Sequence, residues 1–430
     1  MKTIGIKTLG CKLNFSESAN IERLLVAKGY KLVPFEEKAD VYIINTCAVT
    51  KEAEKKCHYY ARQIKSHYPN SKVAFVGCFS SLRSEQLIQN QEADIILGSN
   101  NKLEVVEAIE NLFHSSSVLP LSQIEDKTHF VSAYSLHERT RSFLKIQDGC
   151  DYFCAYCTVA YARGPSRSDS IENILANAQH IVDNHIKEII LTGVNIGDFK
   201  TSKGEDLYNL LTQLAEIKGL ERVRISSIEP NLLSNEIIEL TAKSNQILPH
   251  FHIPLQSGSN RILHNMKRRY KREVFAEKVQ YIKQLMPHAC IAADVIVGFP
   301  GENENDFTET YQFIESLPIS YLHIFPYSKR PGTPAYTLPE QLSKACKKTR
   351  TKQLSELSNR KKHQFYTENI GSKRSVLFET QTTNHQLSGF TDNYIKVWVN
   401  GKKEEINTIQ KVHLLDFISN DTLIGEIITE

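Results

Sequence analysis

The chain has 430 residues, a formal net charge of +3 and 41% hydrophobic residues. This length suits two or three domains, and the composition is that of a globular protein with a sizeable core. A charge so close to neutral does not by itself indicate a nucleic-acid partner. No run approaches the ~18 apolar residues of a membrane helix, and the first residues, MKTIGIKTLGCKLN, lack the apolar core of a signal peptide. We therefore expect a cytoplasmic protein with no membrane partner.

The first 115 residues alternate strand and helix patterns, which is typical of a parallel sheet flanked by helices. Ser16 is the expected N-cap of the first helix, and Gly29 is its expected stop. From residue 114 to about 136 the sequence becomes Ser-rich and polar, as in a linker. Strands are predicted at 3–8, 41–45, 72–76 and 94–97, and helices at 16–28, 52–67 and 101–113.

A second series of strand and helix patterns follows. Strands are predicted at 143–147, 188–192, 222–226, 250–254, 290–298 and 321–326, with helices between them, as at 171–184, 207–217 and 273–285. About six such repeats can form an open, partial barrel with reactive groups at the C-terminal ends of its strands. A basic segment at 343–364 is expected to be helical.

After about residue 367 the pattern changes to short strands separated by turns, at 375–380, 394–399, 411–419 and 423–428. This spacing predicts a small all-β barrel. We therefore expect an α/β chain divided into an N-terminal parallel-sheet domain (1–115), a linker (116–136), a partial (βα)6 barrel (137–366) and a C-terminal all-β barrel (367–430).

The sharpest chemical signal is the segment QDGCDYFCAYC, in which Cys150, Cys154 and Cys157 follow a predicted strand. Thiolates are the usual ligands of iron–sulfur clusters, and three of them leave one iron of a 4Fe–4S cluster open for another ligand. The aromatic residues between the cysteines would shield such a cluster from water. The alternatives are loosely spaced free cysteines or a structural zinc site, and a zinc site requires a fourth Cys or His nearby.

Three further cysteines each follow a predicted strand of the N-terminal domain. They are Cys11 in TLGCKLN, Cys47 in INTCAVT and Cys78 in VGCFS. The carboxyl ends of parallel strands meet at one edge of a sheet, so these thiols are expected to converge there on a second cluster. The alternative is that each is a small buried hydrophobic residue. That structural role is expected for Cys57, Cys290 and Cys346.

Two three-cysteine sets, a partial barrel and a terminal β-barrel resemble the radical SAM methylthiotransferase family over nearly the whole chain. The matching stretches, in chain order, are TLGCKLNFSES, INTCAVT, VGCFS, IQDGCDYFCAYCTVAYARG, LTGVNIGDF, RISSIEP, HIPLQSGSNRILHNMKRRY, ADVIVGFPGE and HIFPYSKRPGTPA. The resemblance implies a radical SAM barrel, two 4Fe–4S clusters, S-adenosylmethionine (SAM) as cofactor and an RNA-binding TRAM-like terminal barrel.

The family's reaction inserts sulfur at an unactivated C–H position and methylates it. The resemblance implies that Cys150, Cys154 and Cys157 hold the radical-generating cluster, and that Cys11, Cys47 and Cys78 hold the cluster that delivers sulfur. The contexts GCKLN and TCAVT look most like the subtype that modifies threonylcarbamoyladenosine at position 37, beside the anticodon of tRNA. The alternatives are the isopentenyladenosine subtype, the subtype that modifies an aspartate of a ribosomal protein and, from another class, a non-catalytic iron–sulfur RNA-binding protein.

Four further residues are candidates for SAM contacts, because they lie in matching stretches at predicted strand ends. Each could equally have an ordinary loop or capping role. They are Gly193 in LTGVN, Ser227 and Glu229 in RISSIEP, and Gln256 in HIPLQSGS.

Basic residues concentrate in two segments, which favours RNA phosphate contacts over a merely solvated face. The terminal barrel is itself acidic, and its Phe390, Tyr394 and Trp398 could either stack on bases or fill the barrel. The implied partners are the anticodon stem-loop of tRNA and a reductant such as flavodoxin or ferredoxin. The basic residues are Lys344, Lys347, Lys348, Arg350, Lys352, Arg360, Lys361, Lys362, Lys373 and Arg374 in one segment, and Lys267, Arg268, Arg269, Lys271 and Arg272 in the other.

Overall fold

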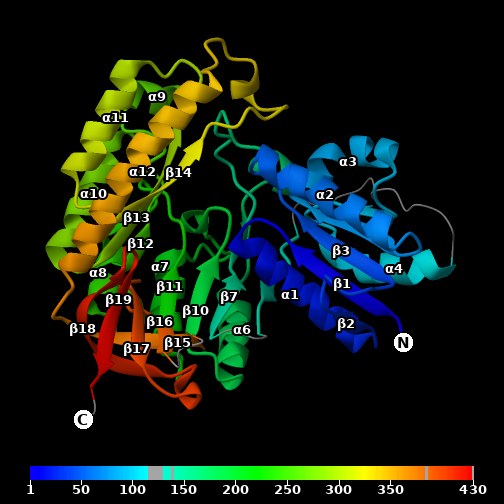
Figure 1. Ribbon diagram of the computed structural model, residues 1–430, viewed down its shortest axis with the longest axis horizontal. Helices are drawn as coiled ribbons and strands as arrows, with labels where there is room; N and C mark the ends of the chain where they lie inside the picture. The colour runs from blue at the N-terminus through cyan, green and yellow to red at the C-terminus, as the bar shows by residue number, and fades with distance from the viewer. Residues whose placement is uncertain (115–128, 137–139, 383–385, 429–430) are drawn as a thin grey trace.

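A computed structural model describes residues 1–114, 129–136, 140–382 and 386–428. Figure 1 shows three parts: a sheet domain at the N-terminus, a larger curved sheet wrapped by helices, and a small barrel at the C-terminus. The sheet domain lies against one side of the curved sheet, and the small barrel lies against its lower end.

The N-terminal domain is a five-stranded parallel sheet in the order β2-β1-β3-β4-β5. Helices α2 and α3 cover one face, and α1 and α4 cover the other. This confirms the predicted parallel sheet. The strands are β1 (Thr3–Thr8), β2 (Lys31–Val33), β3 (Val41–Thr46), β4 (Lys72–Gly77) and β5 (Ile95–Leu97), and the helices are α1 (Lys12–Ala27), α2 (Lys51–His67), α3 (Cys78–Asn90) and α4 (Val105–His114), the last preceded by a 3-10 turn at Lys102–Glu104.

The first helix begins earlier than predicted. Its N-cap is Cys11, whereas Ser16 lies buried inside the helix and donates a hydrogen bond to the carbonyl of Leu13. The buried amide of Asn14 donates to the carbonyls of Leu9 and Thr46, so tertiary bonds fix the first turn. A helix start set by such bonds is not visible in the local sequence.

The central part is an open barrel of six parallel strands, as predicted. Isolated bridges from Val223 to Ile247 and from Ser227 to His252 continue the sheet between its two halves. The strands are β7 (Arg141–Lys145), β10 (Glu188–Thr192), β11 (Arg222–Ile225), β12 (His250–His252), β13 (Cys290–Val297) and β14 (Tyr321–Pro326). Helices α6 (Ile171–Asp183), α7 (Leu207–Leu214), α8 (Asn235–Lys243), α10 (Arg272–Leu285) and α11 (Glu304–Ser316) pack outside, and α9 (Asn260–Asn265) follows β12.

The expected linker contains a strand. β6 (Ala133–Tyr134) pairs antiparallel with β7, while residues 116–128 of that linker lie outside the described residues. Helix α1 holds β6 in place, because Arg23 donates to the carbonyl of Tyr134 and Asn20 to that of Ser132. Such a short strand depends on its neighbours and carries no clear sequence pattern.

Helix α12 (Lys344–Thr367) runs along the core and leads into a closed five-stranded barrel, in the order β15-β16-β17-β19-β18. Its Phe365 and Tyr366 enter the hydrophobic core of this barrel. The barrel was predicted, although β16 was not. Its strands are β15 (Lys373–Gln381), β16 (Gln386–Thr391), β17 (Lys396–Asn400), β18 (Ile409–Ser419) and β19 (Thr422–Ile427), with a 3-10 turn at Lys403–Glu405.

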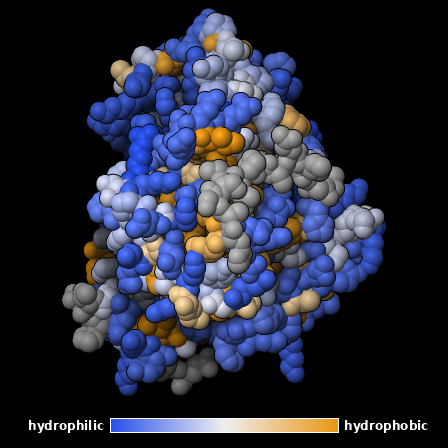
Figure 2. All heavy atoms as spheres, turned by 90° about the vertical axis from the view of Figure 1, so that its right-hand side faces the viewer, coloured by the Kyte–Doolittle hydropathy of each residue, from blue (hydrophilic) through white to orange (hydrophobic). Residues whose placement is uncertain are grey.

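Figure 2 shows the side of the molecule that carries the N-terminal domain. Its surface is mainly hydrophilic, and apolar side chains lie in small separate groups. Among the described residues, no helix is both long and apolar enough to span a bilayer.

Candidate active site

The loop of Cys150, Cys154 and Cys157 connects β8 (Gln147–Asp148) to α5 (Val159–Arg163). It leaves the strand at Gly149, whose φ of +72° is left-handed. A Cβ at this position would lie 1.9 Å from the carbonyl oxygen of Pro165, so only glycine fits. The amide of Cys150 donates to the carbonyl of Gly164 and that of Cys157 to the carbonyl of Cys154, which folds the loop into a compact turn.

The three thiols of this loop lie close enough to affect one another's ionisation. Burial raises the pKa of Cys150 to about 12, and the neighbouring thiols of Cys157 and Cys154 add to the shift. Burial likewise raises the pKa of Cys157 to about 11, and Cys154 adds to it. Three thiols from one loop, with no fourth Cys or His in the same loop, fit a 4Fe–4S cluster that keeps one open coordination position.

Arg268 connects this loop to Glu229. Its guanidinium lies 3.0 Å from the sulfur of Cys154, donates to the hydroxyl of Tyr156 and forms an ion pair with Glu229. The Arg268 side chain is only 3% exposed. It is therefore part of the cysteine site. The prediction that Arg268 is among the residues that contact RNA phosphates is wrong, because the side chain is buried.

Glu229 and the other predicted SAM contacts lie at the C-terminal ends of successive strands. Gly193 follows β10, Ser227 follows β11, and Gln256 follows β12 with a left-handed φ of +63°. Burial raises the pKa of Glu229 despite its pairing with Arg268. Ser227, Glu229 and Gln256 are all partly exposed, so they face a space that a ligand can reach.

The second cysteine set also comes together. Cys11 follows β1, Cys47 follows β3 and Cys78 follows β4, and these are adjacent strands of one sheet. Burial raises the pKa of Cys47 to about 11, and the thiols of Cys78 and Cys11 add to it. Three converging thiols fit a second cluster. Of the three cysteines expected to have a structural role, Cys57 and Cys290 are buried and Cys346 is partly exposed.

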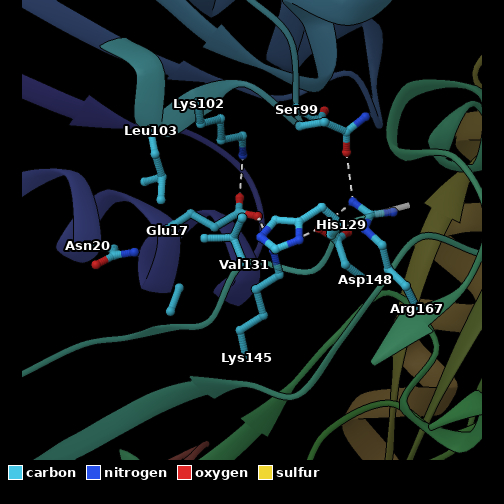
Figure 3. Close-up of a pocket in the computed structure, with 12 residues that line it drawn as sticks. Glu17, Asn20, Ser99, Lys102, Leu103, His129, Val131, Lys145, Asp148 and Arg167 are labelled. Carbon is cyan, nitrogen blue, oxygen red and sulfur yellow. Dashed lines mark hydrogen bonds and ion pairs between the residues drawn. The ribbon is translucent and has the colours of Figure 1, made fainter. Parts of the chain in front are cut away.

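A buried network of charges joins the two cysteine regions, and Figure 3 shows five of its side chains, those of Glu17, Lys102, Lys145, Asp148 and Arg167. Arg163, at the end of α5, donates to Glu17 and Asn14 of α1 at 2.9 Å and to Asp148 of β8 at 2.9 Å. Asn14 is three residues from Cys11, and Asp148 is two residues from Cys150. The network therefore bridges the N-terminal domain and the central barrel directly beside both sets of thiols.

Lysines and a second arginine complete this network. Lys145 lies 3.0 Å from Glu17 and 2.8 Å from Asp148, Lys102 pairs with Glu17, and Arg167 lies 3.1 Å from Asp148. Burial alone would raise the pKa of Glu17, but Arg163, Lys102 and Lys145 hold it well below its usual range. The cavity among these side chains measures about 20 Å³, enough for about one water.

A larger cavity of about 220 Å³ touches both cysteine loops. Val49 and Thr50, just after Cys47, form one wall, and Tyr156, just before Cys157, forms another. Much of the lining is apolar or aromatic, as in sites that bind small molecules or bases. The other lining residues are Gln256, Asp294, Ile296, Phe325, Pro326, Tyr327 and Ser328.

Asp294 also belongs to a polar group that we did not predict. The ring of His252 on β12 lies 2.8 Å from the carboxylate of Asp294 on β13, whose register partner on β14 is His323. Ligand atoms of all three lie within 4.8 Å of one another. The alternating neighbours Ala293 and Val295 are buried against the outer helices, so Asp294 faces the inside of the barrel. The alternation along β13, in which Asp294 stands between the apolar Ala293 and Val295, is the sequence signal that could have identified this group.

Lys12, next to Cys11, approaches the same group from α1. One helical turn later, the ring of Phe15 lies 6.3 Å from that of Phe143 on β7, which places this end of α1 against the barrel. Surrounding protein and the guanidinium groups of Arg224 and Arg141 lower the pKa of Lys12 to about 8. Lys12 nevertheless remains exposed, so it lies in a recess that solvent reaches.

The lower end of the barrel binds the C-terminal β-barrel through arginines. Arg222 donates to the carbonyls of Ser375 and Phe390, and Arg224 donates to that of Asp392. Burial would raise the pKa of Glu188, but Arg224 and Arg222 lower it to about 2. Glu188 therefore stays charged and holds both arginines in place.

Two aromatic residues that were candidates either to stack on bases or to fill the barrel, and some basic residues expected to contact RNA, lie at internal contacts. Phe390 and Tyr394 stack on each other at 4.8 Å, with Arg141 over Phe390 and Arg224 over Tyr394. They pack against the central barrel, whereas Trp398 is partly exposed.

In α12, Arg350 is buried against Glu302, and the buried Lys361 donates to the carbonyls of Glu315 and Leu317. Of the other basic residues of this helix, Lys344, Lys348, Lys352 and Arg360 are exposed.

Comparisons with known proteins agree with this architecture. The radical SAM superfamily matches residues 144–314, and the uncharacterized protein family UPF0004 matches residues 3–98. The radical S-adenosylmethionine methyltransferase TsrM of Kitasatospora setae, solved with cobalamin and a 4Fe–4S cluster, has a TM-score of 0.57 at 13% identity. The alignment covers 78% of this chain and 77% of that chain, and at this identity it shows the fold alone.

Curated relatives match almost from end to end. The chain is 38% identical to the threonylcarbamoyladenosine tRNA methylthiotransferase MtaB of Aquifex aeolicus, over 93% of this chain and 97% of that protein. It is 36% identical to the MtaB of Bacillus subtilis, over 96% and 94%. A tRNA-2-methylthio-N(6)-dimethylallyladenosine synthase of Clostridium tetani is 34% identical, over 97% and 94%. With its two converging cysteine sets and this near-complete match, the chain belongs to the radical SAM methylthiotransferase family of enzymes.

Proposed function

We propose that this enzyme inserts a methylthio group into threonylcarbamoyladenosine of tRNA, at position 37 beside the anticodon. The observation that carries the proposal is the 36–38% identity to relatives named for this reaction, over nearly the full length of both chains. The cavity beside both cysteine loops supports it, because its aromatic side chains suit the stacking of an unpaired base.

Cys150, Cys154 and Cys157 would hold the radical-generating cluster, and Gly193, Ser227, Glu229 and Gln256 would bind SAM beside it. When bound, this cluster and SAM supply the one-electron chemistry that activates a C–H bond. Arg268 holds the carboxylate of Glu229 and the sulfur of Cys154 in fixed relative positions, since it contacts both. Tyr156 and Phe153 would limit the access of water to the cluster.

Cys11, Cys47 and Cys78 would hold the second cluster, on the other side of the shared cavity. Thr50 caps α2 by accepting a hydrogen bond from the amide of Ala53, which orients the loop that follows Cys47. The arginine of HIFPYSKRPGTPA, Arg330, donates to the carbonyl of Ala48 in the same loop. These contacts would keep the sulfur-delivering cysteines at a constant distance from the base.

The partners follow from this activity. The exposed lysines of α12 could contact phosphates of the tRNA, and the partly exposed Trp398 of the terminal barrel could stack on a base. A reductant such as flavodoxin or ferredoxin would supply electrons, and a cytoplasmic location would give access to both.

Mass spectrometry of tRNA nucleosides from cells with and without the gene tests the proposal. Loss of the gene should remove methylthio-threonylcarbamoyladenosine and cause its unthiolated precursor to accumulate. If methylthio-isopentenyladenosine disappears instead, the second tRNA subtype is the function, which the 34% identity to a dimethylallyladenosine synthase makes the leading alternative. Unchanged tRNA would contradict both.

A further inference from the structure

The polar group on the barrel's inner face adjoins a cavity that is otherwise largely apolar. Asp294 belongs to both, since it lines the 220 Å³ cavity and accepts a hydrogen bond from His252. A molecule that fills the cavity beside the two cysteine loops would therefore present one end to His252, Asp294 and His323. The chemistry of these side chains then restricts what that end can be.

Lys12 adds a positive charge to this group. Among the residues that the structure describes, Lys12 forms no salt bridge, and the two carboxylates that act on it, Glu188 and Asp294, have other partners. The nearest arginines already have partners, because Arg141 pairs with Glu379 and Arg224 with Glu188. Asp294 is bonded to His252. Lys12 thus remains available to an anion that enters the recess.

A divalent cation is the other ligand that two histidines and an aspartate could take. The electrostatics disfavour it, because Lys12 places positive charge near both Asp294 and His323. A ligand with one negative charge and a hydrogen-bonding hydroxyl suits the whole group better. Lys12 would donate to the anion, while the imidazole and carboxylate groups would bind the hydroxyl.

We propose that Lys12, His252, Asp294 and His323 form the subsite that recognises the threonyl group on N6 of the modified adenosine. This inference rests on the proposed function. A threonylcarbamoyl group ends in a carboxylate and a hydroxyl, whereas an isopentenyl group has neither. Lys12 binds the carboxylate and the two histidines with Asp294 bind the hydroxyl, so this subsite determines substrate specificity.

The test compares anticodon stem-loops that differ only at the N6 group, using the enzyme with both clusters reconstituted. The stem-loops carry threonylcarbamoyladenosine, its methyl ester, or a glycylcarbamoyl group that keeps the carboxylate and lacks the hydroxyl. Dissociation constants and KM are measured for the wild type, Lys12→Met, His323→Phe and the control Lys31→Met. The control removes an exposed lysine from the edge strand β2.

Lys12→Met should weaken binding of the acid stem-loop by roughly tenfold or more and leave the methyl ester unchanged, because only the acid loses a charge-assisted bond. His323→Phe should reduce the preference for the threonyl over the glycyl group. The control Lys31→Met should change neither the relative binding of acid and methyl ester nor the preference for the threonyl over the glycyl group. Iron content and the visible spectrum verify that the variants keep both clusters.

Equal effects of Lys12→Met on acid and ester, or no effect on either, would overturn the inference about this subsite. That result would leave the proposed function standing if the wild type still modifies the threonylcarbamoyl stem-loop. Failure of the wild type to modify it would instead contradict the proposed function, so the two failures are distinguishable.

Discussion

At the scale of single residues, Cys154 shows how one side chain connects a predicted ligand set to its surroundings. Its sulfur lies 3.0 Å from Arg268, which also pairs with Glu229. A buried arginine placed in this way keeps a thiolate ligand and a carboxylate in fixed positions. Cys47 has a different environment, since the thiols of Cys78 and Cys11 act on it more strongly than Arg163 does.

The two cysteine sets should therefore respond differently to substitution. Cys154→Ala is expected to reduce SAM cleavage to background, because two thiols cannot hold the radical-generating cluster. Cys47→Ala should keep substantial cleavage and lose sulfur insertion. For both variants, SAM cleavage is measured as the 5′-deoxyadenosine formed and sulfur insertion as the methylthio-nucleoside formed, with excess reductant. Full sulfur insertion by Cys47→Ala would contradict a second cluster at these cysteines.

At the scale of elements, the turn from β8 into the cysteine loop depends on backbone geometry. Gly149 has a positive φ, and the carbonyl of Pro165 occupies the place where a Cβ would be. Gly204 also has a positive φ, of +86°, but a Cβ there would meet nothing within 4 Å. Substituting each glycine by alanine therefore distinguishes the free-energy cost of a left-handed backbone from that of a steric clash.

Gly149→Ala should lower the iron content by about one cluster per chain, because the loop must move away from Pro165. Gly204→Ala should cost only about 1 kcal/mol in unfolding free energy, from the left-handed backbone alone, and keep full iron content. Iron analysis and thermal unfolding provide the measurements. Equal iron content in the two variants would show that the loop tolerates the displacement.

At the scale of the whole molecule, charged side chains buried between the parts hold them together. Arg163 joins α1 to the cysteine loop, and Glu188 orients the arginines that bind the terminal barrel. Such contacts are costly to break, since removing one partner leaves a buried charge without compensation.

Arg163→Met should lower the unfolding free energy by about 3 kcal/mol and should reduce sulfur insertion more than SAM cleavage. The reason is that Arg163 aligns the two cysteine regions, whereas cleavage needs only one of them. Lys218→Met, which removes an exposed lysine from the outside of the central barrel, serves as the control. A uniform loss of both activities would argue against an aligning role.

The low pKa of Glu188 predicts that the stability of the folded protein depends on pH. Its pKa of about 2 lies below the ordinary value of 4.5, so its ionised form stabilises the folded state by about 3 kcal/mol above pH 4.5. This stability is lost as the pH falls from 4.5 towards 2. Glu188→Gln should therefore be less stable at pH 7 and should depend less on pH between 4.5 and 3, measured by denaturant unfolding. The exposed Glu216→Gln should behave like the wild type.

The sequence by itself determined the order of the parts and the six cysteines that form the two sets. Strand and helix patterns depend on neighbours a few residues apart, so the parallel sheet, the six-stranded barrel and the terminal barrel could all be predicted. The cysteines could be placed because each follows a strand, and the ends of parallel strands meet. Their roles as cluster ligands remain predictions.

Only the tertiary structure decided where the charges lie. Arg268 and Arg350 belong to basic segments of the sequence, yet both are buried in ion pairs with Glu229 and Glu302. Glu17 and Arg163 are 146 positions apart and still pair. No local pattern encodes such pairs, because they form when separate domains pack and exclude water. The polar group of His252, Asp294 and His323 likewise exists only because three strands lie side by side.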